Sequence, residues 1–210
     1  MRWERLFQDL EDQLERETDA ELEDLARDEE RLRIARLTLA DRLHALLSGP
    51  SSLHEVTVAL SLTTLVCRIV RVGRDWALVQ ITSPGTRRGT ALLPTGAMRS
   101  LTCNAVGPRL RDREHSVLSR TDSGRTSSPA VADAGVSSGI GIAFVLRDLC
   151  RRRRQVTLVS HDREWTGTIE RVGKDHLDLA VHPLDQPRTS DAVTTVSVIA
   201  LAHIELIVLV

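Results

Sequence analysis

The hydrophobic pattern of the chain changes its period near residue 50, and this change predicts where helix gives way to strand. From Trp3 to about Leu47 there is no Pro or Gly, and Leu, Glu, Arg and Ala predominate. These residues have high helix propensity. Apolar residues then recur at every second position from Val56 and again from Val156, which is typical of strands that bury one face. The pattern predicts a long N-terminal helix followed by two β-rich segments.

The predicted helix carries two apolar registers. The first is spaced by four, three and four residues, and it supplies our candidates for helix association: Trp3, Phe7, Leu10 and Leu14. The second runs from Leu22 to Leu46, with Glu29 and Arg36 at positions where an apolar residue is expected. The shift between the registers fits one helix with a stutter or two helices. The apolar face predicts either a coiled coil or partner-docking helix, or a helix that packs on its own domain.

The strand-rich part of the chain contains an internal repeat. Residues 56–79 align with residues 156–179 without a gap, and the segment Arg71–Asp75 matches Arg171–Asp175. Such a repeat predicts that one small β-rich unit occurs twice.

Each copy predicts a short helix followed by five strands. The helices are indicated by apolar residues at i, i+4 and i+7, which begin at Leu39 and at Ile142. The strands of the first copy are expected near 56–60, 65–69, 77–81, 90–93 and 99–102. Those of the second are expected near 155–160, 165–171, 176–181, 192–199 and 204–209.

Residues of the second copy resemble the Sm-like family of small SH3-type barrels. The resemblance rests on Val156, Leu158, Asp162, Trp165–Ile169 and Asp175–Leu179. It implies an N-terminal helix and five bent antiparallel strands. That family holds RNA bases with an Arg-Gly signature, which neither copy has, so the resemblance implies the fold more than RNA binding. The whole chain also resembles a protein family of high-GC Gram-positive bacteria, which implies no function.

The expected fold class is therefore α+β: a long N-terminal helix followed by two helix-plus-five-strand Sm-like antiparallel small barrels. The expected segments are an acidic amphipathic helix at 1–37, a first helix-barrel repeat at 38–103 and a second at 139–210. Between the repeats, 104–138 is rich in Ser, Arg, Asp, Gly and Pro and has no apolar period. Such composition predicts a flexible linker.

Charge and cysteine content narrow the function classes. The net charge is −1, but residues 1–33 carry 13 acidic and 6 basic side chains, so an acidic helix precedes a basic remainder. This asymmetry suits self-association or a polyanionic partner. The three cysteines share no short spacing that would predict a disulfide framework or a zinc site. The charged opening residues and the lack of an apolar run of about 20 residues predict a cytoplasmic protein without membrane contact.

Along the predicted strands, side chains that alternate with the core-facing ones are expected to point outward, and four of these outward positions differ between the copies. They are apolar in the first copy and polar in the second: Val66, Val70, Trp76 and Leu78 against Thr166, Glu170, His176 and Asp178. Burying one such apolar side chain is worth roughly 1.5–3 kcal/mol, so we expect something to cover the first copy. The cover is either the N-terminal helix or the second barrel, or else a partner or a second copy of the chain.

The densest basic cluster is Arg151–Arg154, which follows the second short helix. It either complements the helix C-terminus or contacts a phosphate backbone. No nucleophile with a base, no carboxylate pair and no metal-ligand cluster is apparent, so we predict no enzyme, no cofactor and no small-molecule substrate. We expect a non-enzymatic interaction or scaffold protein that acts through its N-terminal helix and the apolar outer face of the first barrel. An RNA-binding regulator that uses Arg151–Arg154 is the alternative.

Overall fold

The computed structural model describes residues 2–49, 55–83, 89–103, 139–184 and 193–209, except that the side chains of residues 2–7, 9–17 and 19–20 lie outside the description. The linker expected at 104–138 also lies outside the described residues. The chain divides into two compact units, residues 1–38 and residues 39–210. Within the described ranges, no helix combines the length and the apolar character that a membrane crossing would need.

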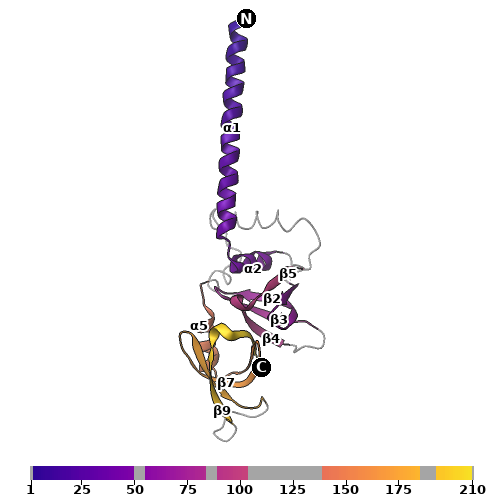
Figure 1. Ribbon diagram of the computed structural model, residues 1–210, viewed down its shortest axis with the longest axis vertical. Coiled ribbons are helices and arrows are strands. Elements are labelled where there is room, and N and C mark those ends of the chain that lie inside the picture. Colours follow the sequence, from indigo (N-terminus) through magenta and orange to yellow (C-terminus); the bar gives the residue numbers. More distant parts are fainter. Residues whose placement is uncertain (1, 50–54, 84–88, 104–138, 185–192, 210) are drawn as a thin grey trace. The chain divides into compact units, whose positions relative to one another are not determined.

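The first unit is a single α-helix, α1 (Arg2–Arg36), which contains Trp3, Phe7, Leu10 and Leu14 (Figure 1). Of the two arrangements that the sequence allows for residues 3–47, the structure has two helices, α1 and then α2 (Leu39–Ser48). The break lies at residues 37–38, and α1 is continuous through the shift of register that follows Leu14. Exposed ion pairs one turn apart stabilise it, such as Arg27–Glu23 and Arg31–Asp28, both at 2.8 Å. Each pair of this kind contributes about 0.2–0.5 kcal/mol, and several such pairs together support a helix of this length.

In its described residues the second unit has two short helices and ten strands. The elements before residue 104 are α2 (Leu39–Ser48), β1 (Glu55–Ala59), β2 (Thr64–Val72), β3 (Trp76–Ile81), β4 (Gly89–Pro94), the 3-10 turn η2 (Thr95–Ala97) and β5 (Ser100–Cys103). Those after residue 138 are α5 (Ile142–Arg151), β6 (Gln155–Ser160), β7 (Glu164–Val172), β8 (His176–Val181), β9 (Thr195–Ala200), the 3-10 turn η3 (Leu201–His203) and β10 (Ile204–Leu209).

The predicted fold class, with two separate helix-plus-five-strand Sm-like barrels, is wrong. All ten strands belong to one antiparallel sheet in the order β5-β1-β2-β3-β4-β10-β6-β7-β8-β9. Strand β4 pairs with β10, which joins the first half of the sheet (β5-β1-β2-β3-β4) to the second half (β10-β6-β7-β8-β9). The physical reason is that an edge strand leaves N–H and C=O groups unpaired. The edges β4 and β10 satisfy each other's groups instead of closing within their own halves.

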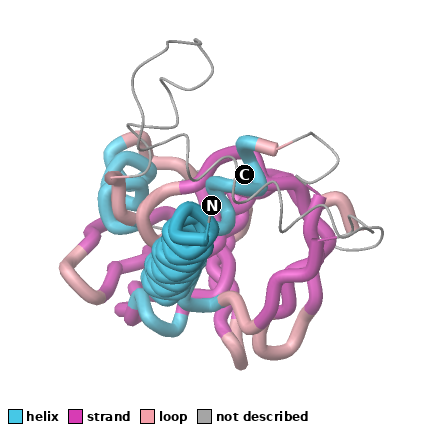
Figure 2. The backbone as a smooth tube through the Cα atoms, turned by 90° about the horizontal axis from the view of Figure 1, so that it is seen from above, coloured by secondary structure: helices cyan, strands magenta, loops and turns pink. Residues whose placement is uncertain are grey.

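The two halves of the sheet nevertheless have the same pairing registers. Strands β2 and β3 pair Ile69 with Val79 and shift register just after Ile69, whereas β7 and β8 pair Ile169 with Leu179 and shift just after Ile169. A bulge of this kind bends a strand and increases its twist. Both halves therefore curve in the same way, and the sheet is strongly curved (Figure 2).

Each half has its own aliphatic core and its own covering helix. Helix α2 packs on β2 and contributes Leu43 and Leu46 to the first core, whereas α5 packs on β7 and contributes Leu146 to the second core. Leu43 and Leu146 are both fully buried. The spacing that predicts the two short helices therefore also identifies the side chains that anchor them.

We predict that Gly167→Ala destabilises the second half of the sheet. A Cβ at Gly167 would lie 2.0 Å from the backbone oxygen of Ala180 on the paired strand, so β7 and β8 would have to separate. Overpacking of this kind costs about 1–3 kcal/mol. Urea unfolding would measure the change, with Gly96→Ala as the control, because a Cβ there meets nothing within 4 Å. Equal stabilities of the two variants would contradict the prediction.

A second prediction concerns His44 on α2. Burial lowers the pKa of His44, against an opposing effect of Asp41, and its buried Nε2 has no hydrogen-bond partner among the described residues. Because the unfolded chain binds this proton more readily, stability is full above the ordinary pKa of 6.5 and falls as the pH drops below it.

Replacing His44 by Leu should therefore reduce the loss of stability on acidification, and raise the free energy of unfolding at neutral pH by up to about 1 kcal/mol. Urea unfolding between about pH 8 and about pH 5 would test this. The matched control is His161→Leu, because His161 is exposed. An unchanged pH dependence in His44→Leu would be evidence against the role of His44.

Candidate interaction site

The contact between β4 and β10, which we call the seam, buries both faces of its strands. Ala91 and Leu93 of β4 lie in the first core, and Leu92 between them lies in the second core. In the same way Val208 of β10 belongs to the first core and Ile207 to the second. Each seam strand therefore alternates between two apolar environments. This explains why these strands are apolar at nearly every position.

Trp76 is the centre of the contact between the two halves. Its side chain is only 4% exposed and lies in the second core, although β3 belongs to the first half. The indole Nε1 donates a hydrogen bond of 2.9 Å to the carbonyl oxygen of Ile140, and the Asp75 carboxylate accepts one of 2.7 Å from the Ile142 backbone N–H at the start of α5. A carboxylate at a helix N-terminus is stabilised by the helix dipole. The β2–β3 turn is therefore fixed to α5.

The four candidate positions of the first half do not form one open surface. Trp76 and Leu78 pack against the second core, and Val66 is partly buried. Only Val70 keeps a large exposed fraction, 48%. Of the covers that the sequence left open, the structure places the second half of the sheet over Trp76 and Leu78.

The second half of the sheet ends at strand β9, which has no covering element in the described part of the chain. Strand β9 pairs on one side with β8, and no described strand pairs with its other side. Val196 and Val198 on β9 are 56% and 71% exposed, whereas Leu92 on β4 is 1% exposed. Exposed valines on a free edge strand form a template for strand pairing. The sequence comparison missed them because the longer β8–β9 loop ends the gapless alignment before β9.

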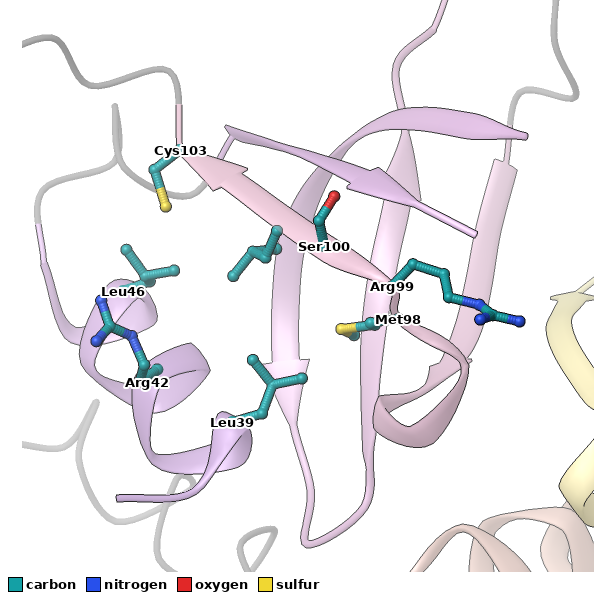
Figure 3. Close-up of a pocket in the computed structure, with 8 residues that line it drawn as sticks. Leu39, Arg42, Leu46, Met98, Arg99, Ser100 and Cys103 are labelled. Atoms are coloured by element: carbon teal, nitrogen blue, oxygen red, sulfur yellow. The ribbon is translucent and has the colours of Figure 1, made fainter. Parts of the chain in front are cut away.

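At the other end of the sheet, β5 borders a cavity of about 380 Å³ between α2 and the segment Met98–Cys103. Figure 3 shows Leu39, Arg42 and Leu46 of α2 on one side and Met98, Ser100 and Cys103 on the other. Strand β5 pairs with β1, and its outer edge has no partner among the described strands. The cavity thus combines apolar side chains with two arginines, Arg42 and Arg99, and borders the outermost described strand of the sheet.

A second cavity, of about 430 Å³, lies between the β1–β2 turn and the β6–β7 turn. It includes the exposed Leu62 from the first half and Arg163 and Glu164 from the second. The guanidinium of Arg163 lies 6.0 Å from the ring centre of Trp165, at the outer limit of a cation–π contact. No periodic signal in the sequence pointed to this groove, because it is made by two turns.

The cluster Arg151–Arg154 ends helix α5. Arg151 and Arg152 form ion pairs with Asp148 at 2.6 and 2.7 Å, and the hydrogen bond from Arg151 is the main cause that holds the pKa of Asp148 below its usual value. Arg153 adopts a left-handed backbone conformation with φ of 53°, and the Arg154 N–H bonds the carbonyl oxygen of Leu149. Two of the four guanidinium groups thus already have a carboxylate partner.

Two further polar side chains in the described residues, those of His182 and Cys67, are buried. The buried His182 ring contacts the Thr168 hydroxyl at 2.9 Å and the Pro183 carbonyl oxygen at 2.9 Å. Burial raises the pKa of the Cys67 thiol to about 11, so it is not a thiolate at neutral pH. Among the described residues no group of three or more His, Cys, Asp or Glu side chains could hold a metal ion.

Comparisons of this chain with known protein families, with curated protein sequences and with solved structures gave no match.

We predict that Trp76→Phe weakens the contact between the halves. The variant keeps most of the apolar area but removes the donor to Ile140, whose carbonyl oxygen then keeps only the hydrogen bond from the Arg74 N–H. Losing one such hydrogen bond costs about 0.5–1.5 kcal/mol. Urea unfolding would measure the loss, with the exposed Val70→Ala as the control, which should change stability by less than about 0.5 kcal/mol. A Trp76→Phe variant as stable as the wild type would contradict the role of this hydrogen bond.

Proposed function

We propose that this chain is a non-enzymatic interaction protein that recruits a basic partner through α1 and uses its sheet as a scaffold. The observation that carries the proposal is a row of exposed leucines on α1. Leu22, Leu25 and Leu32 are 58–61% exposed. With about 100° per residue, the three lie within one narrow sector of the helix, the arrangement with which a helix docks in a groove or on another helix.

The charge of α1 favours a basic partner over a second copy of the same helix. Residues 1–33 carry 13 acidic and 6 basic side chains, so two such helices would repel each other. Glu29 lies within the leucine row by the same helical period. A partner with a Lys or Arg between apolar residues would neutralise it and complement the row.

The alternative, an RNA-binding regulator, has weaker support, because Asp148 forms ion pairs with two of the four arginines of the basic cluster.

A cytoplasmic location is part of the proposal. It fits Cys67 and Cys150, which are free thiols, since disulfides are rare in reducing compartments.

The prediction is that Leu25→Gln combined with Leu32→Gln abolishes partner recruitment without unfolding the protein. Both positions are exposed, and Gln keeps a high helix propensity. Full-length wild-type and variant proteins would serve as baits in an extract of the native cell. Any captured protein would then be purified and titrated against each bait. We expect the double variant to bind at least about tenfold more weakly, since two buried leucines exceed 1.4 kcal/mol.

The matched control is Ile34→Gln, because Ile34 is 52% exposed but lies on nearly the opposite side of α1 from the leucine row. This control should bind like the wild type, and rising salt should weaken binding, since the partner is basic. Equal binding by the double variant, or binding that is insensitive to salt, would refute recruitment by this face.

A further inference from the structure

The cavity of about 430 Å³ between the β1–β2 turn and the β6–β7 turn has one wall from each half of the sheet. We call it the inter-turn groove. Its floor is apolar and comes from both halves: Leu65 and Ile81 of the first half and Leu206 of β10 line it, and each is at most 5% exposed. Because the seam brings β10 beside the first half, the groove depends on the seam.

The two turns that border the groove have the same backbone hydrogen bond but different side chains. In each turn the N–H of the first residue donates to the carbonyl oxygen of the fourth at 2.8 Å, Leu60 to Thr63 and Ser160 to Arg163. At the tip, Leu62 stands where the second turn has Asp162. Leu62 is 73% exposed, the largest fraction among the large apolar side chains described. Turn tips are usually polar, so this leucine is better explained by binding than by folding.

The wall on the side of the second half is acidic. Asp162, Glu164 and Glu205 line the groove, against a single arginine, Arg163. The guanidinium of Arg163 lies 6.0 Å from the centre of the Trp165 ring. Among the described residues, the carboxylates of Asp162 and Glu205 take part in no ion pair or hydrogen bond. The groove therefore offers two unpaired carboxylates beside an apolar floor.

A β-bulge places Glu205 at this wall. Strand β10 pairs Ile204 with Ser160 and Leu206 with Val159, so Glu205 is the extra residue between them. The corresponding pairing of β5 with β1 runs through its four residue pairs without such a shift. Bulges are common beside functional sites, where they re-aim a side chain. The second half thus departs from the first at the point where this brings a carboxylate to the groove.

We propose that the inter-turn groove binds a segment of a partner protein in which a Lys or Arg lies between aliphatic residues. An aliphatic side chain packs between Leu62 and the apolar floor, and the cation lies between Asp162 and Glu205. Charge complementarity favours this occupant, since nucleic acid and anionic lipid have the same sign of charge as the wall. The groove lies wholly within residues 39–210, so the inference does not depend on recruitment by α1.

Peptide titration tests the chemistry of the occupant. The probe is a Ser-Leu-Arg-Leu-Ser peptide with blocked ends, and its controls are Ser-Leu-Glu-Leu-Ser and Ser-Ser-Arg-Ser-Ser. Titration into isotope-labelled full-length protein should shift the backbone amide NMR signals of Leu62, Asp162 and Glu205. Each control should bind at least about tenfold more weakly, because the first reverses the charge and the second removes the apolar contact.

Variants of the groove test which side chains hold the probe. Leu62→Ser should weaken binding about tenfold, and it should unfold at the same urea concentration as the wild type because the side chain is exposed. Asp162→Arg/Glu205→Arg should reverse the preference, so that the Leu-Glu-Leu peptide binds more tightly than the Leu-Arg-Leu peptide. The isosteric variant Asp162→Asn/Glu205→Gln should bind both peptides equally, and it serves where the reversal impairs folding.

The matched control is Phe144→Ser, because Phe144 is 63% exposed and does not line the groove. This variant should bind the probe like the wild type. Groove signals that do not move at millimolar probe overturn the inference, and so does equal or tighter binding of the Leu-Glu-Leu peptide by the wild type. A Leu62→Ser variant that binds like the wild type overturns it as well.

The outcomes also separate the groove from the role of α1. Shifts at the groove that survive Leu25→Gln/Leu32→Gln support a separate site, even where recruitment by α1 fails. Shifts confined to α1 would place the probe on the acidic helix and would overturn binding at the groove. A preference for the Leu-Arg-Leu peptide that persists in both carboxylate variants would overturn the role of Asp162 and Glu205.

Discussion

Strand pairing between β4 and β10 is the constraint on which the rest of the sheet depends. Three residue pairs connect these strands among the described residues, Leu92–Ile207, Ala91–Val208 and Thr90–Leu209. They nevertheless remove two edges and turn two five-stranded halves into one sheet. Because the seam strands then have a core on each face, side chains that would otherwise be exposed become buried. Burial of Trp76 in the second core and its bond to Ile140 follow from this arrangement.

The asymmetry of a tandem explains why corresponding positions differ. The first half is followed by a second half that covers Trp76 and Leu78, so apolar residues there gain the free energy of burial. No described element covers β8 in the same way, and a tryptophan and a leucine in its place would be exposed to water. His176 and Asp178 occupy these positions, and His176 contacts Asp175 at 2.8 Å. Position in the tandem therefore accounts for the change in polarity without any difference in backbone.

The local elements could be predicted from the sequence because their signals are local. The strands expected at 155–160, 176–181 and 204–209 have these bounds in the structure, and β9 begins three residues later than expected. The way the strands assemble could not be predicted in this manner. The pair Leu92–Ile207 joins residues far apart in the chain, and the alternating pattern of an edge strand is the same whether it closes its own half or pairs with another.

The candidate site shows the same limit. The apolar character of Trp76 and Leu78 correctly indicated that something covers them, but alternation alone could not choose between the second half, the N-terminal helix and a partner. Val196 and Val198 escaped notice for a different reason. The loop between strands β8 and β9 is longer than the corresponding loop between β3 and β4, so the gapless comparison of the two copies stopped at β8. Only the pairing registers show that Val198 corresponds to Leu92.

Linkage within one chain also favours the seam. Pairing of β4 with β10 benefits from an effective concentration that is typically in the millimolar range for linked partners. Three described residue pairs are therefore enough to join the two halves into one sheet. Burial of Trp76, Leu78 and Leu92 in the second core then adds apolar contacts to the backbone hydrogen bonds of the seam.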